Sequence, residues 1–552
     1  MKFRLFLCTL LVLSLSPAWA CTSLMVGKNA SADGSVICTY NADSWGTFRS
    51  LLHFPAATHP AGTMRDVING DSKEYLGQIP EAPVTYAVMG NINEWQVTIG
   101  ETTFGGRPEL RDSTGLLDYR TLMELGLQRG RTAREALDVM TSMAERYGYC
   151  STGQSFSICD PNEAWIMEMH GCGAGSKAVV WVAIRIPDNA ICAHANQSRI
   201  RTFDQRDKQN VRFSANCISF ARQRGYFSGK DSEFSFCDAY AIDNFRARRF
   251  CEARVWACYN RFADNFDRYL PFAEGRDLSA EPIPLWIVPN RKVELTDVFA
   301  ILRDHYENTP LSLTQPDDPG RGWYDTPYRP TPLTYDVDGQ TYFNERPIST
   351  QQSAFSWIAQ MRGWLPREVG GLMWWANDDG NMAAYVPVYC RNARQPDCFN
   401  TPNADCVTFS RDNAYWVCNW VANMVYPRYS LMYPAVAAVR DSLQNSWIQA
   451  QADIERRAAQ LADTDPQRAI GMLTDYSQLR GKQMIQRWNT LAEYLIVKYN
   501  DMVVRAEADG KFKRTRTGFK PIVEKPGIPA HIKRDIATHG PQRLKMPPEN
   551  KP

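Results

Sequence analysis

Apolar positions near the N-terminus come in two short runs separated by a turn. Residues 22–27 read as a buried strand, Asp33-Gly34 is a turn signal, and residues 35–40 form a second apolar strand. The two runs predict a β-hairpin. Such a hairpin would hold residue 21 in ordered structure, whereas most chain ends fray.

The same pattern continues along the chain with helices between the strands. A capping box at Thr132-Ala-Arg-Glu135, followed by an apolar helical face, predicts a helix that begins there. Strands that pair first with strands, with helices interspersed, favour a layered α+β fold. Further strands are predicted at Tyr86–Met89, Gln96–Gly100, Ala164–Met169 and Val179–Ile186.

The C-terminal part has a different pattern. Residues 433–504 read as two or three helices, broken once at Pro466, and predict a helical C-terminal extension over 431–505. Residues 506–552 are rich in Lys, Arg, Pro and Gly, which predicts a basic, flexible tail. A solvated tail is far commoner than a nucleic-acid-binding one, so we predict no nucleic-acid partner.

Composition narrows the class of protein. The 552 residues are 44% hydrophobic and 22% charged, as in globular chains, and the net charge of +2 gives no reason to expect nucleic acid or an acidic membrane as partner. Lys2 and Arg4, a short apolar run and Ala18-Trp19-Ala20 predict a signal peptide over 1–20. The expected location is therefore secreted or periplasmic, without an integral membrane span.

Fourteen cysteines remain after the predicted cleavage, which is many for a chain of this kind. Outside the cytosol cysteines pair. The cluster Cys390, Cys398, Cys406 and Cys418 lies in a polar segment without a C-x-x-C pair, so disulfides are favoured there over zinc.

Cleavage after Ala20 would leave Cys21 as the N-terminal residue. A thiol then lies beside an α-amine with a pKa of about 8, which can take the thiol proton and return it to a leaving amine. The sequence lacks an H-E-x-x-H helix, a P-loop, a dinucleotide glycine motif and a G-x-S-x-G elbow. We therefore expect amide hydrolysis by Cys21, with no cofactor and no metal.

Several long stretches resemble the dipeptidase A-like cysteine peptidases, which are N-terminal-nucleophile hydrolases related to penicillin V acylase and bile salt hydrolase. The resemblance covers the chain from Cys21 to about residue 430. It implies a four-layer αββα sandwich with Cys21 at the end of a central strand. The matching stretches are Cys21 to Ser35, Asn93-Glu94, Gly100 to Arg107, Phe156 to Trp165, Ala195 to Ile200, Arg254 to Trp256 and Asn344 to Gln352.

The resemblance implies roles for single residues. Cys21 matches the nucleophile, Asp43 the carboxylate that binds the amine or thiol, Asn196 the amide that holds the amine and the reacting carbonyl, and Arg254 a supporting charge. Taken alone, Asp43 is more often a turn or cap residue, Asn196 a loop residue and Arg254 an ion-pairing surface residue; the resemblance is what favours the catalytic roles. No metal-binding residue is implied.

Two departures from the family pattern concern the substrate side. Tyr40 stands where many relatives carry an Arg, so Arg254 or another residue must compensate, or the amine pKa and substrate preference differ. No Asn is present in residues 101–103, where an oxyanion donor is expected. Glu101, Thr102 and Tyr40 are our candidates for substrate binding.

Three functions remain open. The first is a dipeptidase acting on dipeptides or short peptides. The second is a related N-acyl amide hydrolase of the penicillin V or bile salt acylase type. The third is a non-enzymatic lipoprotein lipidated at Cys21, against which Ala18 and the bulky Trp19 argue. The sequence leaves homo-oligomer formation open.

Overall fold

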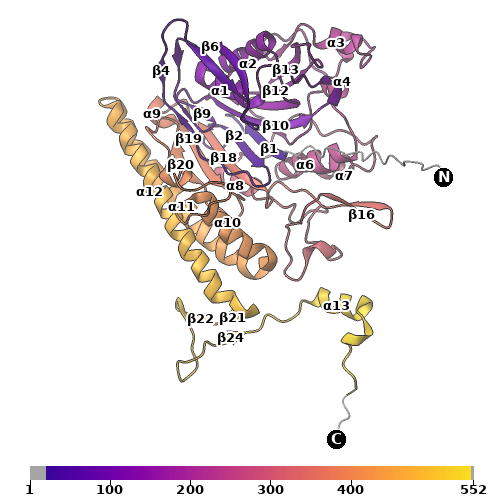
Figure 1. The fold of residues 1–552 in the computed structure, drawn as a ribbon, viewed down its shortest axis with the longest axis vertical. Helices are drawn as coiled ribbons and strands as arrows, with labels where there is room; N and C mark the ends of the chain where they lie inside the picture. Colours follow the sequence, from indigo (N-terminus) through magenta and orange to yellow (C-terminus); the bar gives the residue numbers. More distant parts are fainter. Residues whose placement is uncertain (1–19, 549–552) are drawn as a thin grey trace, which may run out of the picture.

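The computed structural model describes residues 20–548, and the predicted signal peptide lies, apart from Ala20, outside the described residues. Two antiparallel sheets form the centre of the fold (Figure 1). The six-stranded sheet has the order β14 (Ile191–His194), β1 (Ala20–Val26), β2 (Val36–Asp43), β18 (Ser353–Met361), β19 (Gly371–Asn377), β20 (Val386–Tyr389). The eight-stranded sheet has the order β15 (Val211–Phe213), β13 (Val179–Ile186), β12 (Ala164–Gly171), β11 (Gly153–Cys159), β10 (Thr98–Gly105), β9 (Ile92–Asn93), β8 (Val88–Met89), β3 (His53–Phe54).

The two sheets pack face to face, because β10 and β11 contact β1 and β2. Helices α1 (Tyr119–Arg129) and α2 (Ala133–Tyr147) cover the outer face of the eight-stranded sheet and share an apolar core with it. A second apolar core fills the space between the sheets and continues to the C-terminal helices. The expectation of a mixed α and β fold is thus confirmed.

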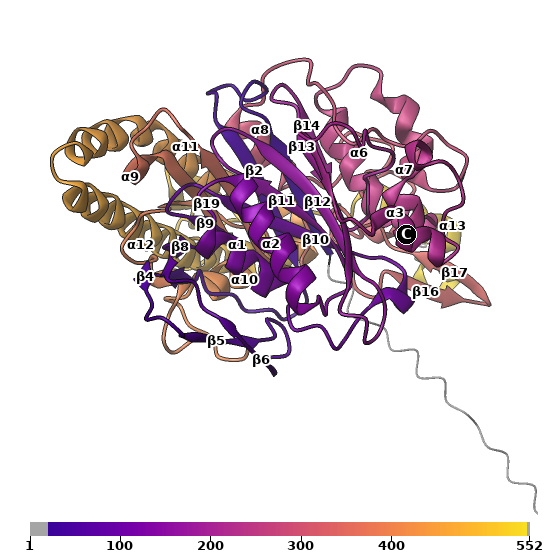
Figure 2. The same cartoon turned by 90° about the horizontal axis from the view of Figure 1, so that it is seen from above.

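Helices α10 (Ala414–Val425), α11 (Tyr429–Ala462) and α12 (Pro466–Tyr499) pack beside β19 and β20. Figure 2 shows α11 and α12 on one side of the sheets and α6 (Ala253–Asn260) with α7 (Leu270–Glu274) on the other. The remaining helices are α3 (Cys217–Gln223), α4 (Phe236–Tyr240), α5 (Phe245–Ala247), α8 (Leu295–Ile301), α9 (Arg367–Gly370) and α13 (Ala530–His539). No helix within residues 20–548 has the length and apolarity that a membrane crossing needs.

Short two-stranded ribbons lie outside the two main sheets. The β5–β6 hairpin (Met64–Ile68 and Tyr75–Pro80) lies beside α1 through contacts of its tip. The tail carries β21–β24 and β22–β23 ribbons and α13, none of whose residues is buried. The other ribbons are β4–β7 (Ala57–Thr58 and Val84–Thr85) and β16–β17 (Thr334–Val337 and Gln340–Phe343), and the tail strands are β21 (Val504–Arg505), β22 (Glu507–Ala508), β23 (Lys511–Phe512) and β24 (Val523–Glu524).

The expectation of disulfides in the cysteine cluster is wrong for this structure. All fourteen cysteines of the described chain are free thiols. Three of the four cluster cysteines are buried, and Cys406 is exposed. Cys390 packs against Gly371 and Cys398 against Gly481, which places them as small apolar side chains at different points of the core.

Candidate active site

Cys21 is the second residue of β1 and lies inside the six-stranded sheet. Its strand is hydrogen-bonded to β14 on one side and to β2 on the other. The side chain is 1% exposed and lines a cleft of about 850 Å³, counted to its open mouth. The end of β2, the segment 44–54, α1 and the β18–β19 edge form the walls of this cleft. The Cys21 side chain therefore borders a cleft that is open to solvent.

The backbone nitrogen of Cys21 is held by Asn196. In the full chain this nitrogen is the peptide nitrogen that joins Ala20, and it donates to Asn196 Oδ1 at 2.6 Å. The amide Nδ2 of Asn196 donates to the Thr103 carbonyl at 2.8 Å. Asn196 has a φ of 61°, a left-handed conformation that Asn adopts more readily than most residues. The Asn196 side chain is thus a fixed acceptor for the Cys21 nitrogen.

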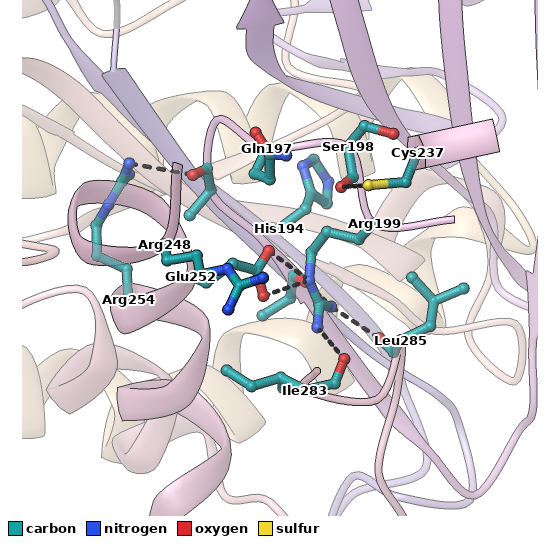
Figure 3. Close-up of polar contacts among 12 residues, drawn as sticks. His194, Gln197, Ser198, Arg199, Cys237, Arg248, Glu252, Arg254, Ile283 and Leu285 are labelled. Atoms are coloured by element: carbon teal, nitrogen blue, oxygen red, sulfur yellow. Dashed lines mark hydrogen bonds and ion pairs between the residues drawn. The ribbon is translucent and has the colours of Figure 1, made fainter. Parts of the chain in front are cut away.

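Arg254 connects the same two segments from α6 (Figure 3). The side chain is fully buried, and its guanidinium donates to the Cys21 carbonyl at 2.6 Å and to Thr22 Oγ1 at 2.9 Å. Its other Nη donates to the Ala195 carbonyl at 3.1 Å and to Asn196 Oδ1 at 3.0 Å. A single cation therefore fixes β1 against the loop that carries Asn196.

Figure 3 also shows how the far end of that loop is fixed. Arg199 forms a buried ion pair with Glu252 at 3.0 Å and donates to the carbonyl of Leu285 at 3.1 Å. The loop between Asn196 and Arg199 is thus tied at both ends by buried arginines. Such a loop holds its side chains in one position.

Asp43, at the end of β2, is paired with a residue that the sequence left without a role. Arg346 Nη2 donates to Asp43 Oδ2 at 2.6 Å, and Ser353 Oγ donates to Oδ1 at 2.7 Å. Burial raises the pKa of Asp43 to about 6, against the lowering effect of Arg346. Among the described hydrogen bonds of this carboxylate none reaches Cys21. Arg346 thus places a buried cation next to Asp43.

The thiol itself faces two polar side chains from different sheets. Cys21 Sγ lies 3.4 Å from the Tyr40 hydroxyl and 3.8 Å from Glu101 Oε1, and Tyr40 donates a short hydrogen bond to the same carboxylate oxygen. Gln154 Nε2 donates to Glu101 Oε2 at 3.0 Å. Burial, followed by the charges of Glu101 and Asp43, raises the pKa of the Cys21 thiol well above its usual range. In the chain with Ala20 attached, the thiol is therefore protonated at neutral pH.

The side chain of Thr102 contacts His194 and does not line the cleft. Its hydroxyl is 2.7 Å from His194 Nδ1, while Ser157 Oγ is 2.7 Å from Nε2 of the same ring. Burial lowers the pKa of His194 to about 3, so the ring is neutral. Thr102 thus joins a bridge between the two sheets, and neither it nor Glu101 is among the side chains that line the cleft.

Replacing Arg346 with methionine should destabilise the fold most at alkaline pH. An unpaired buried Asp43 costs about 3–5 kcal/mol when ionised. The folded-state pKa of Asp43, about 6, already lies above the unfolded value, and loss of the guanidinium raises it further. The loss of free energy of unfolding in this variant therefore grows as the pH rises above about 6, the folded-state pKa of Asp43 in the wild type, and becomes smaller below it. Urea unfolding at pH 5 and pH 8 measures the difference.

The matched control for this variant is Arg456→Met. Arg456 pairs with Asp453 on the surface, with both side chains more than half exposed. Its loss should change the free energy of unfolding by less than about 1 kcal/mol at either pH. If Arg346→Met lost the same free energy of unfolding at pH 5 and at pH 8, the result would contradict the ion pair between Arg346 and Asp43.

Comparison with known proteins places these residues in a family. The model of peptidase family C69 matches residues 20–442. A probable dipeptidase of Salmonella dublin is 26% identical over 412 residues, covering 70% of this chain and 84% of its own. A probable dipeptidase of Latilactobacillus sakei is 26% identical over 434 residues (74% and 82%), and dipeptidase A of Lactobacillus helveticus is 22% identical over 421 residues (72% and 80%).

Proposed function

The chain belongs to peptidase family C69, and on this premise we propose that it is a secreted or periplasmic cysteine dipeptidase with Cys21 as nucleophile. The observation that carries the proposal is the thiol of Cys21, which lines the cleft while its backbone nitrogen is bound by Asn196. Removal of residues 1–20 would turn that nitrogen into an α-amine. The amine would then act as general base for the thiol.

The proposed reaction proceeds through an acyl-thioester. Sγ attacks the scissile carbonyl, the leaving amine takes a proton from the α-ammonium, and water then hydrolyses the thioester. In this scheme Asn196 and Arg254 position the amine, and Asp43 supplies negative charge nearby. We also propose that the stacked sheets with their outer helices are the αββα sandwich of N-terminal-nucleophile hydrolases. The hydrolase domain would span 21–430, with the helical extension at 431–505 and the basic tail at 506–552.

The cleft favours a substrate with a free carboxylate. Arg49 lines it half-buried. Its positive charge acts on Asp71 and Glu124, but within residues 20–548 no hydrogen bond or close ion pair of its guanidinium is described. A substrate carboxylate is a natural partner for such a cation. The apolar wall of Leu52, Phe54 and Trp375 accepts a hydrophobic side chain, and equally an acyl chain of the alternative N-acyl amide hydrolase.

A substrate panel separates the two activities. The purified mature protein is assayed with dipeptides, the matching dipeptide amides, N-acyl amino acids and penicillin V. We expect dipeptides to be cleaved with the highest kcat/KM. Cleavage of acyl substrates with dipeptides left intact would overturn the dipeptidase proposal. Mass spectrometry of the same sample locates the N-terminus, and a lipid adduct on Cys21 would end the enzyme proposal altogether.

Arg49→Met provides the matched variant for this panel. If Arg49 binds the substrate carboxylate, KM for dipeptides should rise about tenfold or more, because a charged hydrogen bond contributes about 1.5–3 kcal/mol. The dipeptide amides lack the carboxylate, so their KM should stay unchanged. An equal rise for both substrate types would show that Arg49 has no such role.

A further inference from the structure

The geometry around the thiol points to a second proton acceptor, and we propose that Glu101 takes the proton of Cys21. The proposal rests on Cys21 as the nucleophile of the proposed function. Glu101 Oε1 lies 3.8 Å from Sγ, within the reach of a sulfur hydrogen bond, on the strand β10 of the facing sheet. The carboxylate is 1% exposed and does not line the cleft. It is therefore placed to act on the thiol and not on a substrate ammonium.

The other contacts of Glu101 fix this orientation. Tyr40 donates to Oε1, the oxygen that also faces the thiol, and Gln154 donates to Oε2 at 3.0 Å. The carboxylate accepts from a phenol, an amide and a thiol, and also from the Thr103 side chain. No ion pair described within residues 20–548 includes Glu101. Only neutral donors hold it, so a proton can bind without breaking an ion pair.

The surroundings also set the pH range in which Glu101 can accept a proton. Burial raises its pKa to about 7, the Tyr40 hydrogen bond lowers it, and the charge of Asp71 raises it. A base is most effective when its pKa lies near the working pH. The titratable groups that influence it from the neighbouring elements are Cys21 of β1, Tyr40 of β2, Asp71 of the β5–β6 tip, Tyr119 of α1 and Tyr149 after α2.

The proposed reaction moves one proton from the thiol to Glu101 and later returns it. The S–H proton moves to Oε1 of the Glu101 carboxylate, the sulfur lone pair forms the C–S bond, and the carbonyl π electrons move to oxygen. The α-ammonium protonates the leaving amine as the C–N bond breaks. Water then attacks the thioester and gives a proton to the α-amine, and Glu101 returns its proton to sulfur as the thiolate leaves.

A second acceptor matters because of the protonation state of the α-amine. An α-amine with a pKa of about 8 is mostly protonated at neutral pH and cannot accept the thiol proton in that form. It remains a good acid for the leaving group. Glu101 would serve as base in the molecules whose α-amine is protonated, while the neutral α-amine remains the base in the others.

Alkylation of Cys21 by iodoacetamide tests the proposal without a peptide substrate. The rate is followed at pH 7.5 by mass spectrometry of the peptide that contains Cys21, in the full-length chain and in the mature protein. In the full-length chain Ala20 blocks the amine, so Glu101 is left as the acceptor at the thiol. We expect Glu101→Gln to slow alkylation at least tenfold in both forms. The surface variant Glu109→Gln should alkylate like the wild type.

The opposite sign of effect would overturn the proposal. The charge of Glu101 raises the pKa of the thiol, so a purely electrostatic neighbour would speed alkylation when it is replaced by Gln. Unchanged or faster alkylation in Glu101→Gln therefore refutes the role as base. If slower alkylation is found but dipeptides are not hydrolysed, the Glu101 proposal stands and the proposed function fails.

Tyr40→Phe is the second variant, which retains the carboxylate. Loss of the Tyr40 hydrogen bonds should raise the pKa of Glu101 and that of the Cys21 thiol. The acid limb of the alkylation rate, which Glu101 sets, should move to higher pH by at least half a unit, and the alkaline limb, which the thiol sets, should move in the same direction. An acid limb that does not move would contradict the proposal. This readout stays informative if Glu101→Gln fails to fold.

Discussion

Replacing Cys21 with alanine is expected to lower kcat for dipeptide hydrolysis by at least about 10³-fold, since loss of the nucleophile leaves only binding and orientation. The fold should survive, because the change removes one sulfur atom from a side chain at the edge of the cleft. Cys21→Ser should keep a trace of activity, since a hydroxyl is a poorer nucleophile at neutral pH. Initial rates and thermal unfolding of each variant are the measurements.

The control for this experiment is Cys38→Ala. Cys38 is a fully buried cysteine on the neighbouring strand β2 and lies outside the proposed machinery. It should keep the wild-type kcat. Undiminished hydrolysis by Cys21→Ala would refute the nucleophile and with it the proposed mechanism.

Replacing Arg254 with methionine is expected to cost about 3–5 kcal/mol of the free energy of unfolding, and to lower kcat more than 100-fold in the protein that still folds. The loss is large because five buried acceptors lose a donor at once. They are the carbonyls of Cys21, Ala195 and Phe250, together with Thr22 Oγ1 and Asn196 Oδ1. Urea unfolding and active-site-normalised kinetics measure the two effects.

Two further variants make the test specific. Arg254→Lys should restore little, because one ammonium cannot reproduce the fork of a guanidinium. Arg201→Met removes a partly exposed pair with Asp238 and should cost less than about 1 kcal/mol. If Arg254→Met were as mild as Arg201→Met, the hydrogen bonds of Arg254 would not be what holds the site.

Local patterns in the sequence predicted local structure well. The strand at Val179–Ile186 has the bounds that its apolar run indicates, and Thr132 caps α2 through Glu135 as its capping box predicts. The break at Pro466 is also confirmed, since this residue begins α12. These features depend on neighbours a few residues apart, which a periodicity can reveal.

Residues that pair with a site residue from far away in the sequence leave no local pattern by which they can be recognised. Arg346 and Ser353 lie more than 300 residues from Asp43. The sequence offered Arg346 only as part of a matching stretch, and Ser353 lies just beyond the end of that stretch. The strands β18 and β19, which place Ser353, were not among the predicted strands. Gln154 was missed because a single amide on a buried strand has no pattern of its own. Site residues supplied by long-range pairing need the three-dimensional fold.

The placement of β1 has a consequence for maturation. In the unprocessed chain this strand is already paired on both edges, with β14 and with β2. Ala20 pairs with Asp43, so the bond to Cys21 lies between the first two residues of this strand. Under the proposed removal of residues 1–20, a cut at this bond would expose an amine at the nitrogen that Asn196 already binds. Such a cut would require only that Ala20 leave its pairing with Asp43, while the rest of the strand stays in place.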